Sequence, residues 1–137
     1  MAKSIAEKLL LKAGASLWVS DPGRRDLLGL LPPGVTDAPR PTAASVAVLV
    51  VESGADARRL LKTHGKALPG VPLVWVLYPK GGRADINRDT LWPIVAEHGM
   101  RPNGQVAIDE TRSALRFRAP KPGEPPFDPG RRPTAGG

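Results

Sequence analysis

The stretches SVAVLVVES (residues 45–53) and VPLVWVLYPK (residues 71–80) decide the fold of this chain. Each is a nearly continuous apolar run rich in β-branched residues, which is typical of strands buried on both faces of a parallel sheet. Between them, residues 55–68 carry apolar side chains at spacings of three and four and therefore predict a helix. We expect a strand, a crossover helix and a second strand parallel to the first.

Shorter elements are predicted upstream of this unit. A capping-box pattern beginning at Ser4 predicts a short helix that ends at Gly14, and residues 15–20 predict a strand. Asp21, which precedes a proline, is predicted to cap a further helix. Residues 34–36 support at most a short edge strand.

Downstream, residues 89–99 predict a helix, and GQVAIDE (104–110) and RSALRFR (112–118) predict two strands joined almost directly. Strands joined so closely pair in antiparallel fashion. The alternation of helices and strands predicts an α/β fold: a small Rossmann-like three-layer domain whose mainly parallel sheet ends in an antiparallel strand pair.

The chain has 137 residues, a length that suits one domain, which we expect over residues 1–118. Residues 119–137 hold six Pro and four Gly and are predicted to form a disordered, solvated tail, with binding to a partner as an extended strip as the alternative. No apolar run reaches the roughly 20 residues of a membrane span. The N-terminus lacks a signal-peptide cleavage pattern. We therefore expect a cytoplasmic bacterial protein without membrane contact.

Composition narrows the chemistry. The absence of cysteine excludes disulfides, thiol catalysis and iron–sulfur clusters, and two histidines are too few for a typical zinc site, so no metal is predicted. A formal net charge of +7 favours an anionic partner. Because the basic residues are scattered and only 4% of residues are aromatic, a solvated basic surface is favoured. A small anionic ligand and nucleic acid are the alternatives.

The carboxyl ends of the predicted parallel strands are the candidate ligand site, because open α/β sheets bind ligands there. Lys80 and Arg88 are expected to contact an anion, and Asp109 to orient a hydroxyl group or one of these cations. Each residue also has a purely structural interpretation, such as helix capping by Asp21 or an ion pair of Lys80 with Glu52 or Asp109. The candidate ligand-binding residues are Asp21, Glu52, Lys80, Asp85, Arg88 and Asp109.

Known cofactor and catalytic motifs are missing. The turn after the first strand, SDPGRRDLLG (20–29), lacks the G-x-G-x-x-G pattern of dinucleotide binding, and no phosphate-binding loop occurs elsewhere. Arg24 and Arg25, at a predicted helix start, could attract an anion together with the helix dipole. His64 shares the apolar stripe of its helix and is expected to pack there. No cofactor is predicted, and the catalytic residues, if there are any, stay unassigned.

Alternation in the last strand places Arg116 and Arg118 on one face and Leu115 and Phe117 on the other. This is the pattern of an ordinary half-buried strand. The arginine face could also bind an anion or an acidic side chain across the hairpin.

The segments LVWVLYPKGG, DINRDTLWPIVAEHG and VAIDETRSALRFR resemble a family of small bacterial proteins grouped as a domain of unknown function. The resemblance implies a short Rossmann-like fold without an established activity, so no catalytic residue carries over. Arg112 departs from it, because the family usually has tryptophan there; if that tryptophan packs on the sheet or stacks on a ligand, this chain has lost the associated function. The main positions that match the family motif are Pro79, Lys80, Asp89, Asp109, Glu110, Ser113, Arg116 and Phe117.

The order of elements also resembles a shortened S-adenosylmethionine-dependent methyltransferase, and ALPGVPLVWVLYP is similar to one segment of such enzymes. At the cofactor-binding places the glycine-rich turn is missing, and Asp37 is the only candidate for the ribose-binding acid. We therefore expect a non-enzymatic or degenerate Rossmann-like binding or regulatory module. The alternatives are a small ligand-binding enzyme of nucleotide or S-adenosylmethionine type and an electrostatic nucleic-acid binder.

Overall fold

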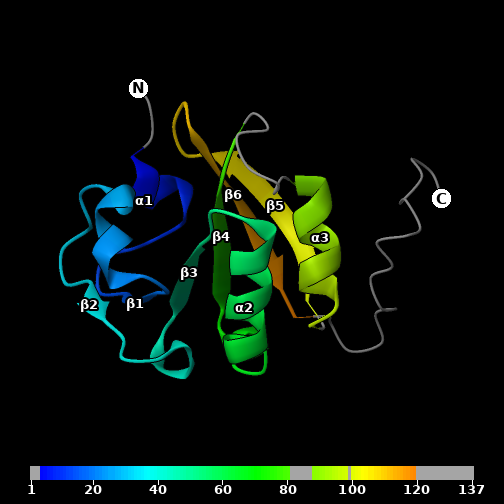
Figure 1. Cartoon of the computed structure of the whole chain (residues 1–137). Helices are drawn as coiled ribbons and strands as arrows, with labels where there is room; N and C mark the ends of the chain where they lie inside the picture. Colours follow the sequence, from blue (N-terminus) through cyan, green and yellow to red (C-terminus); the bar gives the residue numbers. More distant parts are fainter. Residues whose placement is uncertain (1–3, 81–87, 99, 120–137) are drawn as a thin grey trace, which may run out of the picture.

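A computed structural model of the chain describes residues 4–80, 88–98 and 100–119, which form one six-stranded mixed sheet with helices on both faces (Figure 1). The expected α/β, Rossmann-like class is confirmed. The strand order is β2-β1-β3-β4-β6-β5; the first four strands in this order are parallel, whereas β6 is antiparallel to both β4 and β5. The strands are β1 (Ser16–Val19), β2 (Thr36–Asp37), β3 (Val46–Val50), β4 (Leu73–Pro79), β5 (Arg101–Ala107) and β6 (Arg112–Arg118).

The helices divide between the two faces of the sheet. The α-helices α2 and α3 pack on one face, and α1 and the 3₁₀-helix η1 contribute side chains to the apolar cluster on the other. None of the helices in the described ranges is long and apolar enough to cross a membrane. The helices are α1 (Ile5–Lys8), η1 (Pro22–Leu28), η2 (Pro41–Ala43), α2 (Gly54–His64), η3 (Leu68–Gly70) and α3 (Arg88–Ala96).

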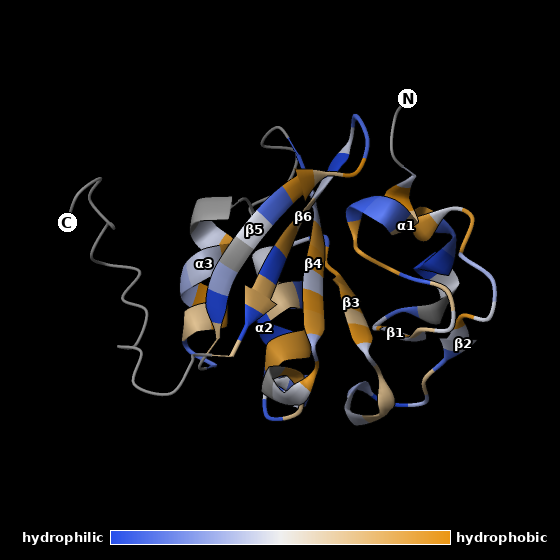
Figure 2. Ribbon diagram, turned by 180° about the vertical axis from the view of Figure 1, so that it is seen from behind, coloured by the Kyte–Doolittle hydropathy of each residue, from blue (hydrophilic) through white to orange (hydrophobic). Residues whose placement is uncertain are grey.

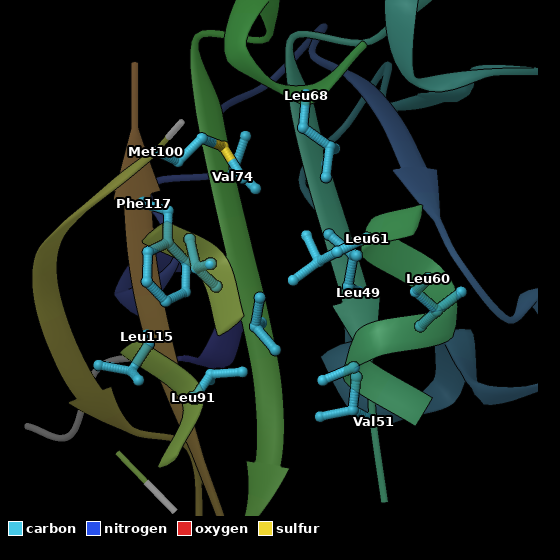
Figure 3. Close-up of a cluster of buried hydrophobic side chains, with 14 of the residues drawn as sticks. Leu49, Val51, Leu60, Leu61, Leu68, Val74, Leu91, Met100, Leu115 and Phe117 are labelled. Atoms are coloured by element: carbon cyan, nitrogen blue, oxygen red, sulfur yellow. The ribbon is translucent and has the colours of Figure 1, made fainter. Parts of the chain in front are cut away.

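Two apolar clusters, one on each face, hold these layers together. In β3 every residue is buried, and alternate side chains enter opposite clusters: Leu49 packs towards α2 and α3, and Val48 towards α1 and η1. Figure 3 shows the first cluster, where Leu61 of α2 and Phe117 of β6 lie on the same face of the sheet, to the right and left of β4. This double burial is the physical reason that the strand sequences lack polar alternation.

Several predicted boundaries were wrong; for example, the helix predicted over residues 89–99 is α3, which ends at Ala96. The first helix has the expected capping box at Ser4 but ends at Lys8, well before Gly14. The chain leaves the helix because Leu10 adopts a left-handed backbone (φ 59°), which lets Leu9 and Leu11 both enter the core. The helix predicted over residues 55–68 ends at His64 and is followed by the short helix η3.

Other expectations correspond closely to the structure. Asp21 caps the element that follows β1, although this element is a 3₁₀-helix and not an α-helix. The predicted edge strand is β2, which lies at Thr36–Asp37 and not at residues 34–36. The terminal hairpin is β5 and β6, but β5 lies at Arg101–Ala107, three residues before the predicted 104–110. Residues 120–137, which hold almost all of the predicted tail, lie outside the described residues, so the proposed domain boundary near residue 118 stays a prediction.

Candidate ligand site at the carboxyl edge of the sheet

The strand order reverses between β1 and β3. After β1 the chain adds β2 on one side, and after β3 it adds β4 on the other, so the carboxyl ends of β1 and β3 form the topological switch point where open α/β sheets bind ligands. At this point the Ser20 hydroxyl oxygen accepts a hydrogen bond of 2.8 Å from the backbone N–H of Val50. The two strand ends are thereby joined, and the loops that follow them start side by side.

Glu52, two residues after β3, is the centre of a three-residue ion network at this edge. Its Oε2 lies 2.8 Å from Nη1 of Arg24 in η1 and 2.9 Å from Nη2 of Arg112, the first residue of β6. The side chain of Arg112 is only 14% exposed, whereas those of Arg24 and Glu52 are 34% and 41% exposed. Arginines from two separate elements, η1 and β6, therefore converge on the carboxylate that follows β3.

The network is cationic. The hydrogen bond from Arg112 is the largest cause that lowers the pKa of Glu52; burial opposes it, and Arg24 lowers the pKa further. Glu52 is thus ionised at neutral pH, and one negative charge faces two guanidinium groups. Within the described part of the chain, Nη1 of Arg112 is buried and has no hydrogen-bond partner. This arrangement has a net positive charge and, among the described residues, one buried N–H group without a partner.

Asp109 acts on the same arginine through the backbone. Its Oδ1 accepts hydrogen bonds from the Thr111 backbone N–H (2.7 Å), the Thr111 hydroxyl (2.9 Å) and the Arg112 backbone N–H (2.8 Å). The backbone hydrogen bond from Thr111 is the largest cause that lowers the pKa of Asp109, although burial opposes it. Asp109 therefore orders the turn that presents Arg112 to Glu52.

The other carboxylates near this edge are also used by the chain itself. Asp21 Oδ1 accepts a hydrogen bond of 3.1 Å from the Gly23 backbone N–H at the start of η1. Asp37, the last residue of β2, forms an ion pair with Nε of Arg25 at 3.2 Å. Neither carboxylate is placed as an acid–base catalyst.

Of the remaining candidates, Lys80 directly follows β4; its backbone N–H donates to the Thr111 carbonyl, and its side chain is half-buried. The suggested pairing of Lys80 with Glu52 or Asp109 is wrong, because Glu52 pairs with the two arginines and Asp109 with the turn backbone. Asp85 lies outside the described residues. Arg88 begins α3, and its side chain and that of Asp89 lie outside the described part of the structure.

Five of the eight motif residues lie in the terminal hairpin, two of them in its turn and three on β6. Pro79 pairs with Arg112 in the sheet, and Ser113 and Phe117 are buried. Glu110 is exposed in the hairpin turn. Among the described residues, no group of three or more His, Asp or Glu side chains is placed to hold a metal ion.

A cavity of about 330 Å³ lies at the opposite, amino edge of the sheet. Its lining is largely apolar, with Lys12 as its charged member, and it is distinct from the carboxyl edge. His64, at the end of α2, packs edge-on against Trp18 with ring centroids 4.7 Å apart, as expected for a structural histidine. The lining residues of the cavity are Leu10, Lys12, Ala15, Ser45, Val46, Pro72 and Leu73.

The fold is similar to that of known Rossmann-fold methyltransferases. A candidate tRNA (m1A22) methyltransferase from Streptococcus pneumoniae, Sp1610, superposes with a TM-score of 0.54 at 14% identity, over 93% of this chain and 73% of that one. The tRNA methyltransferase TrmK from Bacillus subtilis gives 0.52 at 11% identity, over 87% and 66%. A protein of the NADB-Rossmann superfamily from Streptococcus agalactiae gives 0.55 at 12% identity, over 94% and 72%.

At this level of identity the likeness shows the fold alone. No family model and no curated protein matches the sequence. The distant resemblance to the methyltransferase fold is confirmed, whereas the resemblance to a family of unknown function continues to rest on the quoted residues.

The residues at the carboxyl edge do not fit S-adenosylmethionine as this fold would hold it. The turn after β1 is closed by the Asp21 cap and η1 and lacks the expected glycine-rich turn. The ribose-binding acid expected at the end of β2 is Asp37, which is engaged by Arg25. Arg25 therefore occupies the one acidic group that was expected to bind the ribose of this cofactor.

Sequence reasoning missed the partnership of Glu52 with Arg112. Both residues were noted, but Arg112 only as a departure from the family tryptophan. Their pairing depends on β6 lying next to β4, which brings the start of an antiparallel strand to the carboxyl edge. The signal available in the sequence was a charged residue at one end of an apolar run: Glu52 after the first run and Arg112 before the last. Only the strand order shows that these two ends lie next to each other.

Proposed function

We infer that the protein is a ligand-binding domain built on a methyltransferase-like Rossmann fold, and that it takes a small phosphate-bearing anion, such as a nucleotide, at the carboxyl edge of the sheet. The observation that carries this proposal is the convergence of Arg24 and Arg112 on Glu52, with one buried N–H group of Arg112 left unpaired. Planar guanidinium groups bind phosphate with two parallel hydrogen bonds, and a buried donor without a partner favours a ligand that satisfies it.

The described carboxylates support binding without acid–base chemistry. Asp21 and Asp109 accept hydrogen bonds from the chain itself, Asp37 forms an ion pair with Arg25, and the pKa of Asp109 is lowered by its hydrogen bonds. A catalytic acid or base at neutral pH needs a pKa near 7 and a free position beside the substrate. We therefore propose a module that binds or senses its ligand and does not transform it.

Titration with ATP, pyrophosphate and citrate, followed by thermal unfolding and calorimetry, tests this proposal. We expect ATP or pyrophosphate to stabilise the protein, and Arg24→Gln to weaken binding at least tenfold because Glu52 would then repel the anion. Arg58→Gln, which removes an exposed positive charge from α2, is the matched control and is expected to bind normally. Absence of binding by all three anions, or equal weakening in both variants, would overturn the proposal.

A second candidate is S-adenosylmethionine-dependent methyl transfer, which the fold favours although the residues at the carboxyl edge do not. It is supported by the structural similarity to methyltransferases, among them Sp1610 in complex with S-adenosyl-L-methionine (TM-score 0.51, 14% identity). The comparisons favour a small-ligand binder of this type over a module without any ligand. The same titration with S-adenosylmethionine separates the candidates: stabilisation by this cofactor, but not by ATP, would favour the second.

A further inference from the structure

The face of β5 and β6 that points away from α2 and α3 carries arginines and no acid. In the register of the hairpin, Arg101 lies opposite Arg118, and Gly104 lies opposite Arg116. These pairs share the face of Ala114, which belongs to the cluster with α1. The two strands, RPNGQVA and RSALRFR, contain no Asp or Glu. We call this surface, formed by Arg101, Gly104, Arg116 and Arg118, the arginine face.

The arginine face is open. Figure 2 shows β5 and β6 in front of α3, with no described helix over them on this side. The helix α1 lies over the turn end of the hairpin, where Lys8 Nζ donates to the Ile108 carbonyl at 3.3 Å, and beside it the Trp75 indole N–H donates to the Leu9 carbonyl at 3.0 Å. Trp75 of β4 is the sheet neighbour of Arg116, so at this level α1 lies over β4, next to Arg116.

Charge on the arginine face is closely spaced. Residues two apart on a strand are about 6.8 Å apart, and directly opposite residues on neighbouring strands are about 5 Å apart. The Cα atoms of the three arginines therefore lie within about 9 Å of one another. Arg116 is half-buried, and its Nε has no hydrogen-bond partner among the described residues. The glycine opposite it (φ 157°) adds no side chain above the sheet. The register therefore places three arginines on one face of the hairpin, with Nη1 of Arg118 donating to the Ala119 carbonyl at 3.1 Å.

We propose that the arginine face binds the phosphodiester backbone of double-stranded nucleic acid. A linear polyanion matches several guanidinium groups at once, whereas a single small anion would engage only one or two of them. Trp75 is buried under α1 and offers no ring to stack on a base, which favours backbone contact with a duplex over binding of single strands. The surface is separate from the carboxyl edge and does not depend on the function proposed there.

Fluorescence anisotropy with labelled 20-base-pair DNA and RNA duplexes at several salt concentrations tests the proposal. The double variant R116Q/R118Q is expected to weaken duplex binding at least tenfold and to lower the slope of log K against log salt by about 2, because each phosphate contact contributes about 0.9. The matched control R58Q/R59Q removes the same charge from the exposed side of α2 and is expected to lower the slope much less. The DNA and RNA arms show which duplex is preferred.

Two further arms keep the test decisive. R101E, which reverses a charge on the edge strand β5, replaces the double variant if circular dichroism shows that the latter is unfolded. R24Q is expected to bind duplex normally, so failure of the carboxyl-edge site would not count against the arginine face. Equal loss in R116Q/R118Q and R58Q/R59Q would overturn the proposal, and so would equal affinity for poly-glutamate and duplex, which would indicate an acidic protein partner.

Discussion

Replacement of Glu52 by glutamine tests whether the network at the carboxyl edge is a real determinant of stability. E52Q removes the charge that both arginines face, and it leaves the guanidinium of Arg112, with 14% of its side chain exposed, without a counter-ion. A hydrogen bond to a charged group contributes about 1.5–3 kcal/mol, and the 41% exposure of Glu52 reduces this through solvent screening. We expect E52Q to lower the free energy of unfolding by about 1–2 kcal/mol at pH 7.

Urea denaturation measures this loss, with D37N as the matched control. Asp37 pairs with Arg25 at 3.2 Å, but its side chain is 65% exposed, so D37N is expected to cost at most about 1 kcal/mol. The double variant E52Q/R112Q should cost less than the sum of the two single variants, because the partners are in contact. A smaller effect for E52Q than for D37N, or additive costs in the cycle, would refute the reasoning.

The effect has a defined pH dependence. The pKa of Glu52 is lower in the folded than in the unfolded protein, so the folded state holds the proton less strongly. The stabilisation is therefore fully present above the unfolded pKa of about 4.5 and is lost as the pH falls through the lowered folded value. The difference between wild type and E52Q should shrink as the pH falls below about 4.5, and a constant difference down to strongly acidic pH would contradict the assignment.

Two further changes test the interior. Burial lowers the pKa of His64, so the folded protein disfavours its protonation, and the stability of the protein should fall as the pH drops below about 6.5. In thermal melts between pH 7 and pH 5, H64Q should lose this part of the pH dependence. An unchanged slope of stability against pH in H64Q would contradict the assignment. W75F removes the indole donor to the buried Leu9 carbonyl and should cost about 1–3 kcal/mol in urea denaturation, whereas a neutral result would show that α1 is held by packing alone.

The central part of the fold was predictable because it depends on local burial patterns. Residues 46–51 and 73–77 are apolar at every position, and this is sufficient to predict buried parallel strands. The end of α1 was not predictable in the same way. Leu9, Leu10 and Leu11 read as helix, but two of them are buried in the core and the third takes a left-handed backbone, an outcome that tertiary packing determines.

The sequence predicted where the candidate site lies, at the carboxyl edge of the sheet, but not which residues contact one another there. The rule for open sheets selected Glu52 and Asp109, and both lie at the carboxyl edge, but their partners come from strands far away in the sequence. Arg112 follows Glu52 by 60 residues, and only the insertion of β6 beside β4 makes them neighbours. Charge balance between distant residues depends on topology, which a single sequence does not provide.

An NMR titration of the ¹⁵N-labelled protein with ATP is the most direct test of the proposed ligand site. We expect saturable chemical-shift changes in the backbone amides of Ser20, Arg24, Glu52 and Arg112, and their loss in R24Q. Shift changes confined to Gly104 and Arg116 on the arginine face, or an absence of saturation at millimolar ATP, would contradict a binding site at the carboxyl edge of the sheet.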